Sequence, residues 1–154
     1  MIRRLAATLG LLALVAAPAQ AQIPLLDVRI GAHAALPQGD FGDAYDAGFG
    51  AYARVGVPLL MFKLMGSATF TQFKAANPLV EDTNEITLQV GPHFSPIPLL
   101  DLGLEAAYLT DAKEWAYSPN VSIGLLMLDV TASYNKTFES GGASWLTLGV
   151  GFRF

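Results

Sequence analysis

Two histidines, His33 and His93, are the side chains that could ligate a metal ion or act as a general base. The chain has no cysteine, and no closely spaced His, Asp or Glu accompanies either histidine, so a zinc-type ligand set is not indicated. Nucleophilic catalysis needs a nucleophile held beside its base, and no serine stands at a spacing that places it beside a histidine. We therefore expect no catalytic residue, no bound metal and no cofactor, and interpret both histidines as hydrogen-bonding groups.

Three aspartates, Asp40, Asp43 and Asp46, form the next candidate group because carboxylate oxygens are the ligands that calcium prefers. Their spacing does not match an EF-hand loop, so we interpret them as part of a solvated acidic loop. The nearby Gly48-Phe49-Gly50 opens a strand-like segment rather than a helix, so it does not predict a phosphate-binding loop.

Composition limits the function classes further. The chain has 154 residues, of which 53% are hydrophobic and 14% charged, with a net charge of −4. A typical soluble domain carries about 25% charged residues, so this chain lacks the charges of an ordinary wetted surface. The acidic balance also argues against nucleic acid as a partner, because its phosphates attract clustered Lys and Arg.

The first 21 residues have the pattern of a secretory signal peptide. Arg3 and Arg4 are followed by an apolar run from Leu5 to Ala17 and by Ala19-Gln20-Ala21, an A-x-A cleavage site. A transmembrane anchor needs about 20 apolar residues, and Pro18 ends this run sooner. We expect residues 1–21 to be removed and residues 22–154 to form one domain.

Alternation of apolar and polar residues with a period of two predicts eight strands in the mature chain. Four similar apolar segments begin at Leu25, Leu59, Leu99 and Leu125 and indicate four hairpins. The predicted strands are 26–36, 49–57, 62–71, 85–94, 100–108, 120–125, 128–135 and 145–154. Pro92 cannot donate to a strand ladder, so it predicts a bulge or an early end of the fourth strand.

The two faces of these strands differ sharply in charge. One face has no charged residue, whereas the other carries Asp27, Arg29, Arg54, Lys63, Glu85, Asp101, Glu105, Asp129 and Arg153. A soluble lipocalin-like barrel would turn the apolar face inward, and a membrane barrel would turn it outward. Small Gly, Ser, Thr and Ala residues on the polar face, with nearly balanced charges, suit a narrow lumen. We predict that the nine charged residues pair in a lumen network, since unpaired buried charges cost several kcal/mol each.

The connections between the predicted strands also favour a membrane barrel. Those near Pro58, Pro96–Pro98 and Leu126 are short and apolar, whereas 37–46, 74–84, 111–117 and 139–143 are longer and polar. Short turns at one end and long loops at the other are typical of membrane barrels. Strands of about 10 residues, tilted by about 45°, span about 24 Å. Five aromatic residues stand at or near strand ends on the long-loop side: Phe41, Tyr45, Trp115, Tyr117 and Phe138. We expect those near the membrane boundary to form an interfacial girdle.

The end of the chain, Leu146 to Phe154, alternates apolar and small or polar residues and finishes on Phe152-Arg153-Phe154. It resembles the C-terminal insertion signal of bacterial outer-membrane proteins, with Phe152 and Phe154 as its aromatic positions. At the level of pattern, residues 25–154 resemble the small OmpA/OmpX-type barrels. The resemblance implies an all-β, eight-stranded antiparallel up-and-down transmembrane β-barrel in the outer membrane. It also implies contact with outer-membrane lipid, recognition of the last strand by the barrel-assembly machinery, and a monomer.

The expected function is non-enzymatic. Eight strands enclose a space that side chains fill, so we expect a plugged lumen and exposed loops that serve surface interaction or envelope integrity. Two alternatives remain open at this stage: a barrel enzyme that modifies lipid A, and a soluble periplasmic lipocalin-like barrel that binds a ligand.

Overall fold

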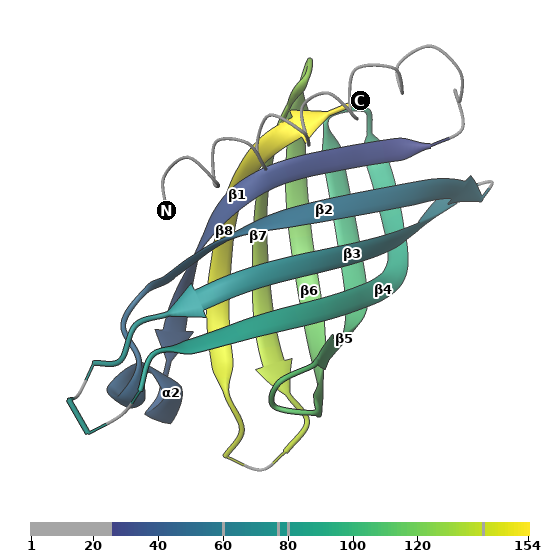
Figure 1. Cartoon of the computed structure of the whole chain (residues 1–154). Coiled ribbons are helices and arrows are strands. Elements are labelled where there is room, and N and C mark those ends of the chain that lie inside the picture. Colours follow the sequence, from purple (N-terminus) through teal and green to yellow (C-terminus); the bar gives the residue numbers. More distant parts are fainter. Residues whose placement is uncertain (1–25, 60, 77, 80, 140) are drawn as a thin grey trace.

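The chain forms a closed antiparallel barrel of eight strands (Figure 1). The computed structural model describes residues 26–59, 61–76, 78–79, 81–139 and 141–154, so the predicted signal peptide, residues 1–21, lies outside the described residues. The strands are β1 (Asp27–Gln38), β2 (Gly48–Leu59), β3 (Phe62–Phe73), β4 (Thr83–Ile97), β5 (Leu100–Leu109), β6 (Glu114–Leu125), β7 (Leu128–Thr137) and β8 (Ser144–Arg153). A short helix, α2 (Asp40–Ala44), lies between β1 and β2. The predicted fold class is confirmed.

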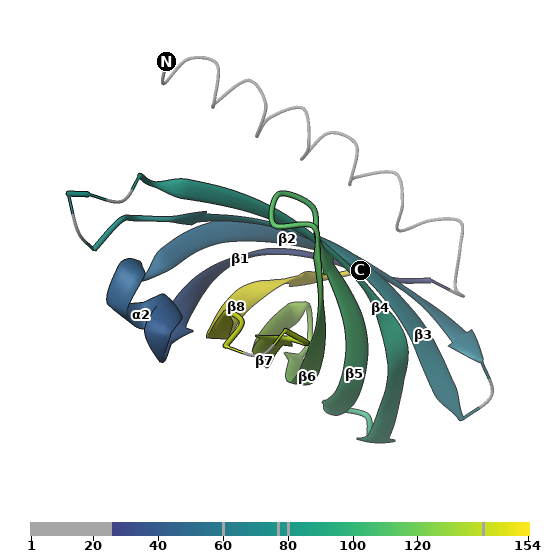
Figure 2. The same ribbon diagram turned by 90° about the horizontal axis from the view of Figure 1, so that it is seen from below.

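Each strand pairs with its neighbours in sequence, and β1 pairs with β8 to close the barrel. The closing ladder runs from Arg29 opposite Arg153 to Gln38 opposite Ser144. Figure 2 shows the strands curving around a common axis, with α2 at one end. Because the barrel is closed, no strand edge is left open along this seam.

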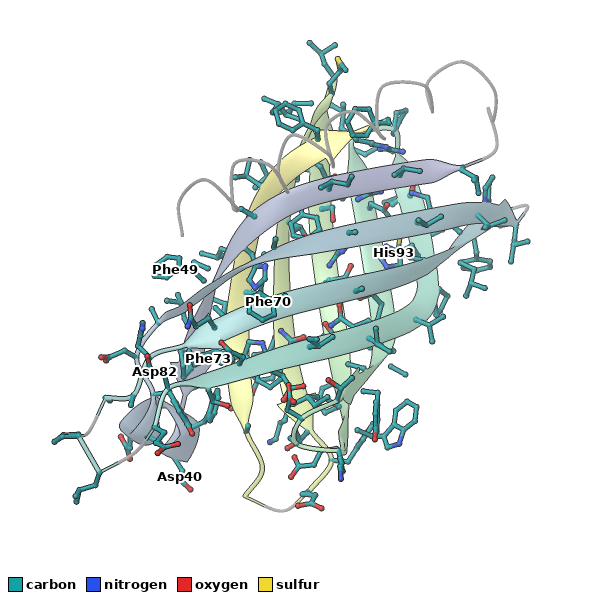
Figure 3. All side chains as sticks on the ribbon, viewed as in Figure 1. Asp40, Phe49, Phe70, Phe73, Asp82 and His93 are labelled. Carbon is teal, nitrogen blue, oxygen red and sulfur yellow. The ribbon has the colours of Figure 1, made fainter. Side chains whose placement is uncertain are left out.

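The apolar face of every strand is on the outside. Leu104, Val90 and Val150 are about half exposed, whereas the polar residues that alternate with them are buried inside the barrel. Figure 3 shows Phe49 and Phe70 pointing away from the barrel and His93 within it. No helix among the described residues is both long and apolar enough to cross a membrane.

The two ends of the barrel differ in their connections. The short-turn end has the links 60–61, 98–99 and 126–127, and the long-loop end has 39–47, 74–82, 110–113 and 138–143. The predicted loop 111–117 is wrong, because β6 begins at Glu114 and pairs with β5 from Leu109 opposite Glu114 onward. Lys113, with φ of 58°, turns the chain there.

Pro92 neither shifts the register nor ends its strand, so that prediction is wrong. The pairing of β4 with β5 omits Gly91 and Pro92 and resumes at His93 opposite Gly103 in the same register. Pro92 keeps its register position opposite Leu64 of β3, and the missing N–H coincides with the interruption of the pairing with β5. The register shift comes later, between Phe94 and Ile97.

Candidate functional site

Arg29 is the centre of an ion-pair cluster in the lumen at the short-turn end. Its side chain is fully buried and contacts three carboxylates. Nε and Nη2 donate to Asp27 at 3.0 and 2.8 Å, Nη1 donates to Asp129 at 3.0 Å, and Nη2 also donates to Asp101 at 2.5 Å. A guanidinium has donors in a planar fork that suits several carboxylates at once, so one cation joins β1, β5 and β7.

Two further cations from other strands complete this cluster. Lys63 on β3 contacts Asp27 and, at 2.8 Å, Asp101. Arg153 on β8 donates to Asp27 at 3.0 Å. All of these residues except Arg153 lie close after a short turn or at the start of β1, and Arg153 ends β8 at the same level. We call Asp27, Arg29, Lys63, Asp101, Asp129 and Arg153 the ion-pair cluster.

His93 attaches a fourth carboxylate to the ion-pair cluster. Its Nδ1 lies 3.2 Å from Asp101 and its Nε2 lies 2.9 Å from Glu105. Its exposed fraction is 1%. The register places His93 opposite Gly103, between the two carboxylates of β5, and a Cβ at Gly103 would lie 2.4 Å from Nε2. Sequence reasoning left His93 out of the charge network; the hairpin register around the turn at 98–99 is the signal that could have found it.

The other two residues of the predicted charge network lie elsewhere. Arg54 is buried in the middle of the lumen, where its nearest polar contact is Thr131 Oγ1 at 3.4 Å. Glu85 lies at the long-loop end and accepts the backbone N–H groups of Asp111 and Ala112 at 3.2 and 3.3 Å. The nine residues therefore occupy three levels of the lumen.

Neutral polar side chains fill the lumen between these levels. Gln89 accepts from Ser67 at 2.9 Å and donates to Asn135 at 3.3 Å. Asn135 in turn donates to Thr147 at 3.1 Å, and His33 bonds Thr71 at 2.9 Å. Hydrogen bonds thus cross from β3 and β4 to β7 and β8, so the interior is a packed polar layer, as eight strands allow.

Aromatic side chains fill the mouth at the long-loop end. Phe41 of α2 packs against Phe73 at 5.1 Å and Trp145 at 6.1 Å between ring centroids, and Tyr45 packs against Phe41 at 5.0 Å. We call these four residues the aromatic plug. Phe41 and Tyr45 do not belong to an interfacial girdle, because Phe41 of α2 and Tyr45 directly after it pack against the buried cluster in the lumen. Trp115 and Phe138 remain on the outer surface, where they pack against Tyr108 and Tyr117.

An acidic rim surrounds the aromatic plug. A cavity of about 510 Å³ lies between the two, and its walls include Glu85, Asp111, Glu114 and Glu139. Asp40 of α2 and Asp82 of the 74–82 loop lie at this end as well (Figure 3). Among the described residues no cluster of three or more His, Asp or Glu is arranged to hold a metal ion.

Phe152 and Phe154, the residues of the predicted insertion signal, lie on the outer surface at the short-turn end. Phe154 donates its backbone N–H to Val28 at 2.9 Å, which extends the seam between β8 and β1. The aromatic positions of the last strand thus face outward beside the closing seam.

Known proteins resemble this chain in structure and not in sequence. No family model matches the chain, and no curated protein matches its sequence. A de novo designed transmembrane β-barrel superposes with a TM-score of 0.59 at 10% identity, covering 86% of this chain and 98% of that one. The crystal structure of Ail, the attachment invasion locus protein of Yersinia pestis, gives 0.56 at 16% identity over 86% of this chain and 100% of that one. The structure of the Yersinia pestis outer-membrane protein Ail in a phospholipid nanodisc gives 0.56 at 14% identity, over 84% and 99%. The fold is shared with small membrane barrels.

Proposed function

We propose that this chain is a non-enzymatic outer-membrane β-barrel with a side-chain-filled lumen, whose long loops serve surface interaction or envelope integrity. The observation that carries the proposal is the inverted distribution of polarity. The outer surface of the strands is an apolar belt, and seven charged side chains of the strands are buried inside, whereas Lys136 at the long-loop end of β7 is exposed. A soluble lipocalin-like barrel has the opposite arrangement, whereas a lipid-facing apolar belt is what a membrane barrel requires.

Export and assembly follow from the same proposal. A signal peptide over residues 1–21 would direct the chain out of the cytoplasm. The barrel-assembly machinery would recognise β8 through Phe152 and Phe154, and outer-membrane lipid would surround the belt. A monomer is favoured because the closed ladder leaves no strand edge for a second chain to pair with.

Enzymatic action on lipid A finds little support in the lumen. His33 bonds the Thr71 hydroxyl beside a lumen space of only about 20 Å³, and His93 bonds two carboxylates. A hydroxyl and an imidazole can form a catalytic pair, but a space of this size does not admit a lipid acyl chain to Thr71, and His93 has no hydroxyl partner. The side chains at the loop end offer a surface for contact instead.

The charge of the loop end narrows the partner that the loops would contact. Nine acidic and three basic side chains lie at this end of the described chain: Asp40, Asp43, Asp46, Glu81, Asp82, Glu85, Asp111, Glu114 and Glu139, with Lys74, Lys113 and Lys136. Complementary potentials favour association and like charges oppose it. The proposed surface partner is therefore cationic.

Membrane fractionation tests the proposal most directly. We expect the full-length protein to sediment with the outer membrane, and the folded barrel in mild detergent to migrate differently before and after boiling. Recovery in the periplasmic extract, with no shift on boiling, would overturn it in favour of the soluble alternative.

A planar-bilayer recording tests the filled lumen separately. Hydrogen-bonded side chains cross the interior, so we expect the purified protein to show no stable large conductance. Steady porin-sized openings would contradict the filled lumen without contradicting the membrane location.

A further inference from the structure

Arg54 is a buried cation without a carboxylate partner. Its exposed fraction is 5%. Its guanidinium makes a long hydrogen bond of 3.4 Å to Thr131 Oγ1, and its central carbon lies 5.4 Å from the centre of the Tyr52 ring. No salt bridge within 4.0 Å joins it to an acidic side chain in the part of the chain that the structure describes. Asp129, two residues before Thr131 on β7, gives its contact to Arg29 instead.

Arg54 lines a small space in the middle of the lumen. This cavity has a volume of about 20 Å³, enough for one water-sized particle, since about 10 to 15 Å³ is needed on this measure. No Asp or Glu contributes to its walls. They consist mostly of hydroxyl and amide side chains, and Trp145 closes the side toward the aromatic plug.

Three buried polar atoms on residues of these walls have no hydrogen-bond partner: Arg54 Nε, Tyr52 Oη and His33 Nδ1. The first two are hydrogen-bond donors. His33 Nε2 contacts the Thr71 hydroxyl. When Nε2 accepts the hydrogen bond from this hydroxyl, Nδ1 carries the ring proton and is a donor as well. Donors therefore gather from β1 and β2 around a space that no carboxylate lines.

We propose that the lumen binds one monatomic anion of the halide class, chloride under physiological conditions, beside Arg54. A negative ion would accept from donors that lack acceptors and would neutralise the guanidinium, since charge-assisted hydrogen bonds are the stronger ones. A halide is a single atom and therefore suits this small space better than a tetrahedral oxyanion such as phosphate. The site is separate from the ion-pair cluster, whose carboxylates contact other cations.

Iodide quenching of tryptophan fluorescence reads out this site. The chain has two tryptophans: Trp145 lines the cavity, and Trp115 lies on the outer surface. In a Trp115→Phe background, refolded in a halide-free gluconate buffer, we expect iodide to quench Trp145 with a saturable dependence that chloride competes away. Adding Arg54→Gln should abolish the saturation.

Matched variants separate a site from a general charge effect. Lys136→Gln removes one positive charge from an exposed position on β7 and should leave the saturable quenching unchanged, and Arg54→Lys should restore part of it. Each variant is first checked for the shift on boiling that marks a folded barrel. Linear quenching that is the same with and without Arg54 would overturn the proposal.

Crystals of the unaltered protein grown in bromide decide the question even if the Arg54 variants do not fold. We expect an anomalous-scattering peak between the Arg54 guanidinium and the Tyr52 hydroxyl. Electron density there without an anomalous signal would identify the occupant as water and would also overturn the proposal.

Discussion

The two ends of the lumen are closed by different contacts, ion pairs at the short-turn end and aromatic rings at the long-loop end. At the short-turn end, Asp27, Asp101 and Asp129 each contact a buried cation, and Glu105 contacts His93. At the long-loop end, the aromatic plug fills the space, and no salt bridge within 4.0 Å joins the rim residues Asp111, Glu114 and Glu139 to a basic side chain in the described part of the chain.

This difference follows from access to water. An unpaired charge in an enclosed space keeps the whole cost of its desolvation, so the carboxylates of the closed end require cations beside them. Acidic side chains on an open rim stay hydrated and need no partner. The same cylinder of strands therefore combines an end sealed by ion pairs and an end sealed by aromatic contacts.

Among the substitutions that test this difference, Arg29→Met should lower the stability of the barrel most. It would leave three buried carboxylates short of their shared cation, and removing one partner of a buried ion pair costs about 3–5 kcal/mol. We expect the free energy of unfolding, measured by urea titration in lipid vesicles, to fall by that amount.

Lys74→Met is the matched control for Arg29→Met. Lys74 pairs with Asp82 in an exposed loop, and exposed pairs contribute little to stability because solvent screens them. An equal loss for both substitutions would show that the ion-pair cluster is no more sensitive than a wetted loop.

Leu104→Arg tests the belt that both ends share. Leu104 lies outside near the middle of β5, with an exposed fraction of 56%, and an arginine at the bilayer midplane costs about 2–4 kcal/mol. Leu125→Arg, at the short-turn boundary of the belt, should cost about 0–1 kcal/mol. An equal loss of unfolding free energy in urea titrations of the two variants would mean that the cost of an arginine does not depend on its depth in the membrane.

The substitution Thr87→Arg, on the opposite face of the strands from Leu104, tests which face points into the lumen. Thr87 is buried inside the barrel, so the variant should fail by overfilling the lumen. A spin label at position 104 should report lipid contact and one at 87 should not. The reverse result would invert the assignment of the two faces.

Much of the barrel could be predicted from sequence because a strand alternates its faces at every residue. The start of β6 was missed because Glu114 is charged and reads as a loop residue, although Trp115 and Ala116 already alternate outward and inward. Helix α2 has five residues, too few for a helical period, so the inward turn of Phe41 left no signal.

The arrangement inside the lumen was less accessible from sequence. Alternation places Arg29 and Arg54 on the same face of their strands. Which residues of non-adjacent strands lie at the same height along the barrel axis depends on the registers of all the strand pairs between them. Those registers bring Arg29 level with carboxylates of β5 and β7 and set Arg54 against Thr131. Distances between non-adjacent strands, and hence the partner of each charge, need the closed structure.

Phe41→Ala should weaken the aromatic plug by a smaller amount. The ring is only partly buried, so we expect a loss of about 1–2 kcal/mol, below the 3–5 kcal/mol typical of a fully buried phenylalanine. The ion-pair cluster should stay intact, and easier access from the long-loop end should add a linear component to the iodide quenching of Trp145. Unchanged stability and unchanged quenching in the Trp115→Phe background would show that Phe41 does not close the mouth.

The smallest expected effect concerns Asp82 in the exposed loop 74–82. A hydrogen bond from Lys74, at 2.6 Å, and one from the backbone N–H of Ala75, at 3.0 Å, lower the pKa of the Asp82 carboxyl below its usual value of 3.8. Since the folded pKa is the lower one, these bonds favour the folded loop above the unfolded pKa and are lost as pH falls through the folded pKa.

In the Lys74→Met variant, carboxyl NMR titration should show the pKa of Asp82 rising toward its usual value, while the backbone N–H keeps part of the shift. The urea midpoint of the barrel at neutral pH should stay nearly unchanged, because an exposed pair is screened by solvent whereas the Arg29 pairs are not. An unaltered pKa would mean that the Lys74 contact is not maintained in solution.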